Sequence, residues 1–267
     1  MKTLINSENN NKIMNKIHLI PMIYEFFISS ICLILVRNIA RKYIERKKPV
    51  IKYLFLFTLM LSFSVFVAAI SRILRLTDLW ILVPDNPLTP NIDESIKIEL
   101  LSITVSLIAV SDLFLVVFIL EVFYNGAFIE KNKKIIYLYL ILSSFSSIYS
   151  ISTGIFVEDL TNQIWLFVIL ISAPLYVILT RSSFKLSRRI DDPLDKLSMK
   201  LMGFGGISIL LVFILFLLDA MVGGKYSPFY YIAWSFAMIS IVFLYISVLQ
   251  PVWFKKIFEN STSNQNK

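Results

Sequence analysis

Three acidic residues, Glu25, Asp112 and Glu121, stand inside long apolar stretches of the sequence. Charged groups at membrane depth are costly and are often functional. Glu121 is close to the end of its stretch, where a side chain can reach the lipid headgroups, so we interpret it as an interfacial acid. Counted from the inner ends of their stretches at about 1.5 Å per residue, Glu25 and Asp112 both fall near the bilayer midplane.

Two carboxylates at one depth on different helices suggest two kinds of chemistry. They could share a proton or hold a cation, as the coupling site of a transporter does. Alternatively, each could hydrogen-bond to a neighbouring helix and serve only to hold the helices together. The sequence leaves both interpretations open.

Polar and small residues follow Glu25 at helical spacing. They are His18, Pro21, Glu25, Ser29 and Cys32, which share one helical face. A polar stripe on a membrane helix is expected to face the bundle interior rather than lipid. We therefore take Glu25, Asp112, Ser29 and His18 as candidate ligand- or cation-binding residues.

Two further faces of small residues are interpreted as helix-packing seams, since small side chains let membrane helices approach closely. One comprises Ser143, Ser146, Ser147, Ser150, Thr153 and Gly154, and the other Ala233, Ala237, Ser240 and Ser247.

Several kinds of chemistry are excluded by residue type. Cys32 is the only cysteine and His18 the only histidine, so neither an intramolecular disulfide nor a histidine-rich zinc site can form. No nucleophile–base pair or phosphate-binding loop is recognisable. We expect no catalytic residues, metal or cofactor, and a protein that is not an enzyme. A retinal pigment needs a buried lysine, and the last apolar stretch has none.

The elements that carry these residues are predicted from composition. Apolar residues make up 57% of the 267 residues and charged residues 16%, whereas soluble domains carry about 25% charged residues. A helix of roughly 20 apolar residues crosses a bilayer. The sequence predicts an all-α integral membrane protein, a bundle of seven transmembrane helices. The predicted spans are 17–36, 53–76, 98–123, 135–156, 163–180, 201–219 and 228–250.

Basic residues predict the orientation of this bundle. Of the 26 Lys and Arg residues, 19 lie in 37–52, 124–134, 181–200 and 251–267, which alternate with connections that hold the other seven. Basic residues concentrate on the cytoplasmic side. We therefore expect a multi-pass protein of the cell membrane, with the N-terminus outside and the C-terminus in the cytoplasm. This topology explains the net charge of +8 without nucleic acid, and we expect membrane lipid as a partner, since contact with anionic headgroups is compatible with the basic clusters.

Outside the spans, residues 1–16 are expected to form a polar, disordered extracytoplasmic tail. Residues 17–250 form the transmembrane domain. The connection 79–90, with three prolines and Trp80, predicts a structured cap or interfacial segment. Residues 251–267 predict a short cytoplasmic amphipathic segment followed by a disordered tail.

The longest inner connection, 181–200, is the predicted contact with a cytoplasmic partner. Its motif Asp191-Asp192-Pro193 predicts that one helix ends there and the next begins. Its partner-contact candidates are Arg188, Arg189, Asp191 and Asp192.

Function is predicted from topology and the buried acids. Seven spans are the topology of heptahelical receptors, but the third stretch ends without their acid-Arg-aromatic triplet, so we assign no family. We expect a receptor-like sensory bundle that passes its signal to a separate cytoplasmic protein, because few residues follow the last span. The alternative is a small-solute transporter with Glu25 and Asp112 as a proton- or cation-coupling pair.

Overall fold

The structure is a computed structural model that describes the backbone of residues 2–76, 100–124, 133–156, 161–222 and 227–257. The predicted cap at 79–90 and the tail beyond residue 257 lie outside these residues. The described part is all-helical, and apart from a short helix at 252–257 it consists of seven helices without strands. These helices are α1 (Lys2–Arg46), α2 (Pro49–Leu76), α3 (Leu100–Phe123), α5 (Lys133–Phe156), α6 (Thr161–Ser187), α7 (Pro193–Val222) and α8 (Pro228–Leu249).

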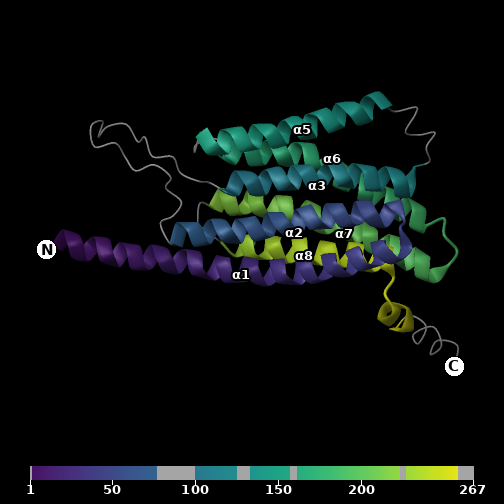
Figure 1. The fold of residues 1–267 in the computed structure, drawn as a ribbon, viewed down its shortest axis with the longest axis horizontal. Helices are drawn as coiled ribbons and strands as arrows, with labels where there is room; N and C mark the ends of the chain where they lie inside the picture. The colour runs from purple at the N-terminus through teal and green to yellow at the C-terminus, as the bar shows by residue number, and fades with distance from the viewer. Residues whose placement is uncertain (1, 77–99, 125–132, 157–160, 223–226, 258–267) are drawn as a thin grey trace.

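The helices run side by side along one long axis, with α5 at one margin of the bundle (Figure 1). Most helices pack against their sequence neighbours, as α1 does with α2 and α7 with α8. In addition, α1 packs against α8 and α3 against α6. The contact between the first and last helices is non-local, and it brings together residues more than 200 positions apart in the sequence.

Six of the described helices contain a section long and apolar enough to cross a membrane, namely those in α1, α2, α3, α6, α7 and α8. In α5 the described apolar section is the shorter stretch Ile136–Ser146. Large apolar side chains such as Ile20, Phe27 and Ile34 of α1 point away from the bundle. Exposed apolar surface of this extent fits a lipid environment. The chain is therefore a multi-pass membrane protein.

Several helices, α1 above all, extend beyond the apolar stretches that predict them. α1 runs over Lys2–Arg46, whereas its predicted span is 17–36. The backbone of the asparagine-rich tail is helical, which differs from the predicted disorder. Adding a residue to an existing helix is much easier than nucleating one, so a membrane helix can continue into polar sequence. Hydropathy detects the apolar part and misses this extension.

Local sequence signals fix several helix ends. Lys47, with a φ of 50°, adopts the left-handed conformation between α1 and α2. α6 ends at Ser187 and α7 begins at Pro193, which confirms the predicted break. There the Asp192 carboxylate accepts a hydrogen bond from the Asp195 backbone N–H at 2.8 Å, as an N-cap does.

The small residues predicted to line a seam on the last helix are buried, and one of them, Ser240, contacts α7. Ala233, Ala237, Ser240 and Ser247 are all at most 5% exposed. The Ser240 hydroxyl donates to the Gly205 carbonyl of α7 at 2.9 Å. Side-chain-to-backbone bonds of this kind require close backbone approach, which small residues permit.

Candidate functional site

Glu25 is the centre of a polar cluster that joins three helices. Its side chain is completely buried and accepts a hydrogen bond at Oε1 from the Tyr230 hydroxyl of α8. Arg72 of α2 places Nη2 at 3.7 Å from the same carboxylate oxygen and 3.4 Å from the Tyr230 hydroxyl. Opposite charges so placed compensate one another away from water. We call Glu25, Arg72 and Tyr230, with the adjacent Ser29 and Trp234, the Glu25 cluster.

The Glu25 cluster lies towards one end of the bundle. Arg72 is in the last turn and a half of α2, and Tyr230 is in the first turn of α8. α1 and α2 are antiparallel neighbours, and Glu25 and Arg72 lie nearly the same number of residues from the turn at Lys47. At about 1.5 Å per residue the two side chains therefore reach the same height. The predicted outer face of the protein is at this end.

Aromatic rings surround the Glu25 cluster. The Trp234 ring packs edge-on against Phe216 of α7 at a centroid distance of 5.4 Å and lies 6.3 Å from the Tyr230 ring. The Tyr24 hydroxyl of α1 donates to the Tyr231 carbonyl of α8 at 2.9 Å. An aromatic wall excludes water and lowers the local dielectric, which strengthens the Glu25–Arg72 attraction.

Three buried polar atoms of the cluster have no hydrogen-bond partner among the described residues: Glu25 Oε2, Ser29 Oγ and Trp234 Nε1. Several other buried serine and threonine hydroxyls donate either to their own helix, as Thr58 does to the Leu54 carbonyl at 2.8 Å, or to a neighbouring helix, as Ser240 does to the Gly205 carbonyl at 2.9 Å. Ser29 makes no such bond. Buried polar atoms in proteins are nearly always satisfied, and each exception calls for an explanation.

Asp112 belongs to a second, separate polar cluster. Its side chain is completely buried in the middle of α3 and accepts a hydrogen bond from the Ser172 hydroxyl of α6. Its other oxygen accepts one from the Tyr176 hydroxyl at 2.8 Å. Both carboxylate oxygens are thus engaged. Asp112 therefore joins α3 to α6 as an interhelical clamp.

The Asp112 clamp spans the proline in α6. Pro174 lies between the two donors, Ser172 and Tyr176, and its ring prevents the usual backbone hydrogen bond at this turn. One turn away, the Ile171 carbonyl accepts a hydrogen bond from the Tyr139 hydroxyl of α5 at 3.2 Å. Side chains from α3 and α5 thus support the part of α6 that proline weakens.

The predicted carboxylate pair is therefore not formed. Both acids face the bundle interior, as predicted, but they bond to different helices and lie at different heights. Glu25 bonds to Tyr230 in the first turn of α8, whereas Asp112 bonds to the middle of α6, so the two acids do not share the height that counting from the apolar boundaries predicted. The described residues also contain no group of three or more His, Cys, Asp and Glu side chains that could hold a metal ion.

The other candidates on the first helix fall into two groups. Pro21, Ser29 and Cys32 are buried, so the polar stripe faces the interior as predicted. The His18 side chain lies outside the described residues. On α5, Ser143 and Ser146 are buried, as a packing seam requires. The side chains of the other predicted members of that face, Ser147, Ser150, Thr153 and Gly154, are not among those that the structure describes.

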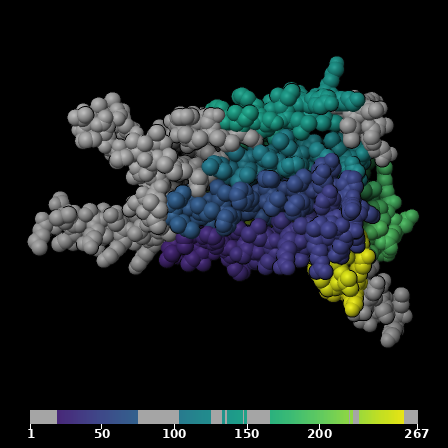
Figure 2. Space-filling model, in the orientation of Figure 1, coloured from purple at the N-terminus to yellow at the C-terminus, as the bar shows by residue number. Residues whose placement is uncertain are grey.

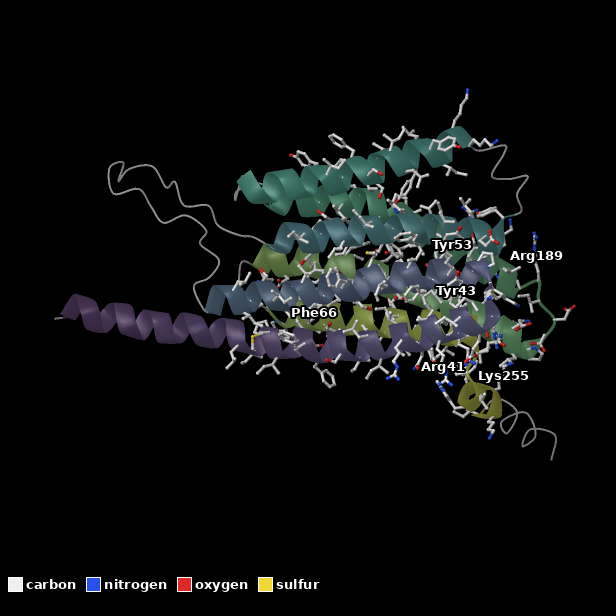
Figure 3. All side chains as sticks on the ribbon, in the orientation of Figure 1. Arg41, Tyr43, Tyr53, Phe66, Arg189 and Lys255 are labelled. Atoms are coloured by element: carbon white, nitrogen blue, oxygen red, sulfur yellow. The ribbon has the colours of Figure 1, made fainter. Side chains whose placement is uncertain are left out.

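The partner-contact candidates lie at the opposite end of the bundle from the Glu25 cluster. Arg188, Arg189, Asp191 and Asp192 are all exposed in the turn between α6 and α7. Figure 3 shows Arg189 projecting from this end, away from the helices. The Asp192 carboxylate caps α7, so it has a structural role besides its exposure.

Sequence reasoning missed Arg72, Tyr230 and Trp234 in the first cluster, and Ser172 and Tyr176 in the second. Arg72 was visible in the sequence as a base near the outer end of its stretch. Counting from the shared turn between the first two helices would have aligned it with Glu25. The aromatic and serine partners carry no comparable signal, because such residues are common in membrane helices.

No protein-family model, curated protein or solved structure matches the chain. The class to which it belongs is defined by its fold: an all-helical, multi-pass membrane protein with a buried acid–base cluster near one end.

Proposed function

We propose that this protein is a receptor-like membrane bundle in which the Glu25 cluster binds a polar ligand. The observation that carries the proposal is the group of three unsatisfied polar atoms beside the buried Glu25–Arg72 ion pair. A polar group from outside the chain would complete their hydrogen bonds. Buried charges in membrane helices are most often kept for such a purpose.

The topology that this function requires is seven crossings with the N-terminus outside. α5 would be the seventh crossing, since its helix of 24 residues is long enough to span the bilayer. The Glu25 cluster then lies near the outer end of the bundle, and the 188–192 turn faces the cytoplasm. The basic residues at that turn and at the α1–α2 turn support this orientation.

The Glu25 cluster is suited to transmit ligand binding because it joins three helices. Glu25, Arg72 and Tyr230 come from α1, α2 and α8. α8 packs against α7, whose first residues follow the 188–192 turn. A ligand that competes for Glu25 or Arg72 changes the preferred arrangement of these helices, and this change reaches the turn through α7 and α8. A cytoplasmic protein that contacts Arg188, Arg189 and Asp191 would then receive the signal.

A small-solute transporter is the second candidate, and the Asp112 clamp is the observation that favours it. Transporters often place substrate or ion sites at interrupted membrane helices. Asp112 bonds to α6 on both sides of Pro174, in the middle of the bundle. A transported proton or cation would be carried there rather than on a shared Glu25–Asp112 site.

Flux into proteoliposomes distinguishes the two candidates. For a receptor, wild-type protein gives no proton-, sodium- or solute-dependent flux under any imposed gradient. Robust wild-type flux that Asp112→Asn abolishes, with folding intact, would reject the receptor and establish the transporter. Thermal unfolding of each variant, measured alongside, shows whether the loss of flux is a loss of fold.

A further inference from the structure

The segment that follows α8 forms a short helix, 252–257, set across the long axis of the bundle (Figure 1). Gln250 adopts a left-handed conformation with a φ of 42°, and Pro251 prevents the preceding helix from continuing. The chain therefore turns sharply where the membrane helix ends.

The direction of this turn is fixed by side-chain contacts. The Gln250 amide donates from Nε2 to the Asp195 carboxylate at 2.7 Å and to the Ser198 hydroxyl at 3.0 Å. Both acceptors are in the first turns of α7. The short helix thus begins from a position anchored to the bundle.

The surface of this short helix is amphipathic. Trp253 and Ile257, one helical turn apart, are 51% and 62% exposed, and the Phe254 ring packs edge-on against Trp253. Lys255 and Lys256 occupy the opposite side at helical spacing, and residues 251–257 contain no acidic side chain. Large apolar side chains would not remain in water if a membrane surface were within reach.

A membrane surface is within reach because of the geometry of α8. The apolar sequence of α8 continues to Leu249, the last residue of the helix, so we place the bilayer boundary near residue 250. A helix that starts there and runs across the bundle axis lies in the plane of the interface. Figure 2 shows the segment, in yellow, at the end of the bundle where α1 and α2 are joined. Arg41 of α1 and Lys255 are both at this end (Figure 3).

We propose that residues 252–257 are an interfacial anchor that docks onto anionic phospholipids. Trp253, Phe254 and Ile257 enter the boundary between headgroups and acyl chains, where tryptophan is especially favoured. Lys255 and Lys256 remain at headgroup level and contact the lipid phosphates. Positive charge at a bilayer surface selects anionic over zwitterionic lipid, and this attraction is weakened by salt.

The proposal is tested with spin labels in nanodiscs that contain the full chain. Ile257→Cys and Lys256→Cys place one label on each side of the short helix. Cys32 is completely buried, so the wild-type protein measures any background labelling. Accessibility to oxygen and to a polar nickel complex gives the depth of each label, in phosphatidylcholine discs and in discs with added phosphatidylglycerol.

In discs with phosphatidylglycerol we expect the label at residue 257 to be accessible to oxygen and protected from nickel, and the label at residue 256 to remain accessible to nickel. Replacing Lys255 with Gln should lower the equilibrium constant for docking about fivefold. Nickel accessibility at residue 257 in both lipids would overturn the proposal. Protection from both reagents would also overturn it, because the segment would then pack on protein. Equal docking in both lipids would reject the anionic partner.

Discussion

Glu25 and Arg72 form an ion pair that is almost fully removed from water, and such pairs respond strongly to the loss of one partner. The Glu25 side chain is 0% exposed and that of Arg72 is 9% exposed. Removing one charge leaves the other buried and uncompensated, which typically costs 3–5 kcal/mol, whereas removing both costs far less. This asymmetry separates a true ion pair from two independent polar residues.

We predict that Arg72→Gln lowers the free energy of unfolding by about 3 kcal/mol or more. The double variant Glu25→Gln/Arg72→Gln should recover most of this loss, since it leaves no unpaired charge. Unfolding of the purified protein in detergent measures both. Arg41→Gln is the matched control: Arg41 pairs with Glu45 at 3.3 Å, but its side chain is 81% exposed, so its loss should cost about 1 kcal/mol or less. If the losses of unfolding free energy in Glu25→Gln and Arg72→Gln simply add in the double variant, the two residues are not an ion pair.

We predict that the Ser29 hydroxyl lowers the stability of the fold, as groups that serve ligand binding often do. Its buried hydroxyl has no hydrogen-bond partner among the described residues, so Ser29→Ala should raise the midpoint of thermal unfolding. Ser240→Ala is the matched control, because the Ser240 hydroxyl donates to the Gly205 carbonyl at 2.9 Å. That variant should lose about 0.6–1.7 kcal/mol. If Ser29→Ala and Ser240→Ala lose the same unfolding free energy, the Ser29 hydroxyl must make a stabilising hydrogen bond, which would contradict this prediction.

At the scale of helices, α6 and α7 pack with their backbones unusually close at Gly206. A Cβ atom placed there would lie 2.4 Å from Thr180 Oγ1 and 3.2 Å from the Tyr176 carbonyl oxygen. Tyr176 belongs to the Asp112 clamp, so this contact and the clamp fix the position of α6 together. The absence of a side chain at Gly206 is therefore a requirement of the packing.

Gly206→Ala should accordingly destabilise the bundle by about 1–3 kcal/mol, since α6 must move to admit the methyl group. Gly205→Ala is its control. The nearest atom to a Cβ at that position is Leu244 Cγ, at 3.3 Å, which a side-chain adjustment can relieve. Unfolding measurements on the two variants compare neighbouring glycines of one helix. An equal cost at both positions would contradict the close approach of α6 and α7.

The sequence predicted the helices better than it predicted their contacts. Apolar stretches report burial in lipid, so each predicted span lies within or overlaps a helix of the structure. Helix ends such as Arg46 lie outside lipid and leave no hydropathy signal. Counting from the apolar boundary at residue 36, and not from the turn that α1 shares with α2, concealed Arg72 as the partner of Glu25. The Asp112 clamp depends on the packing of α3 against α6, which follows from no local pattern.

At the scale of the whole molecule, the two polar clusters lie in different regions of the bundle. The Glu25 cluster joins the first and last helices near one end, and the Asp112 clamp joins α3 and α6 at mid-length. Contacts between α7 and α8 connect the first cluster to the exposed turn at the other end. In the proposed receptor, the clamp would keep α3 and α6 together while α1, α2 and α8 adjust.

The proposed orientation predicts the outcome of reporter fusions. Fusions at Lys48, Lys133, Ser187 and Lys267 should be cytoplasmic, and fusions at Asn86, Asp159 and Lys225 should be outside, because basic connections stay inside. At each site, fusions to alkaline phosphatase, which is active only outside the cytoplasm, and to a fluorescent protein that is active only inside it give opposite readings. A cytoplasmic reading at Asp159 would show that α5 does not cross the membrane. The number of crossings would then be even, which contradicts the proposed seven.

The measurement that tests the central claim most directly is the distance between α1 and the α6–α7 turn, both at the end of the bundle away from the Glu25 cluster, when the ion pair is broken. Spin labels at Arg41→Cys and Arg189→Cys report on α1 and on the α6–α7 turn, and buried Cys32 adds no label. If the Glu25 cluster controls the turn, Glu25→Gln should shift or broaden the distance distribution in nanodiscs. Asp112→Asn, whose amide can still bond Ser172 and Tyr176, should leave it unchanged. A distribution that Glu25→Gln does not alter, in protein that remains folded, would contradict the receptor-like function.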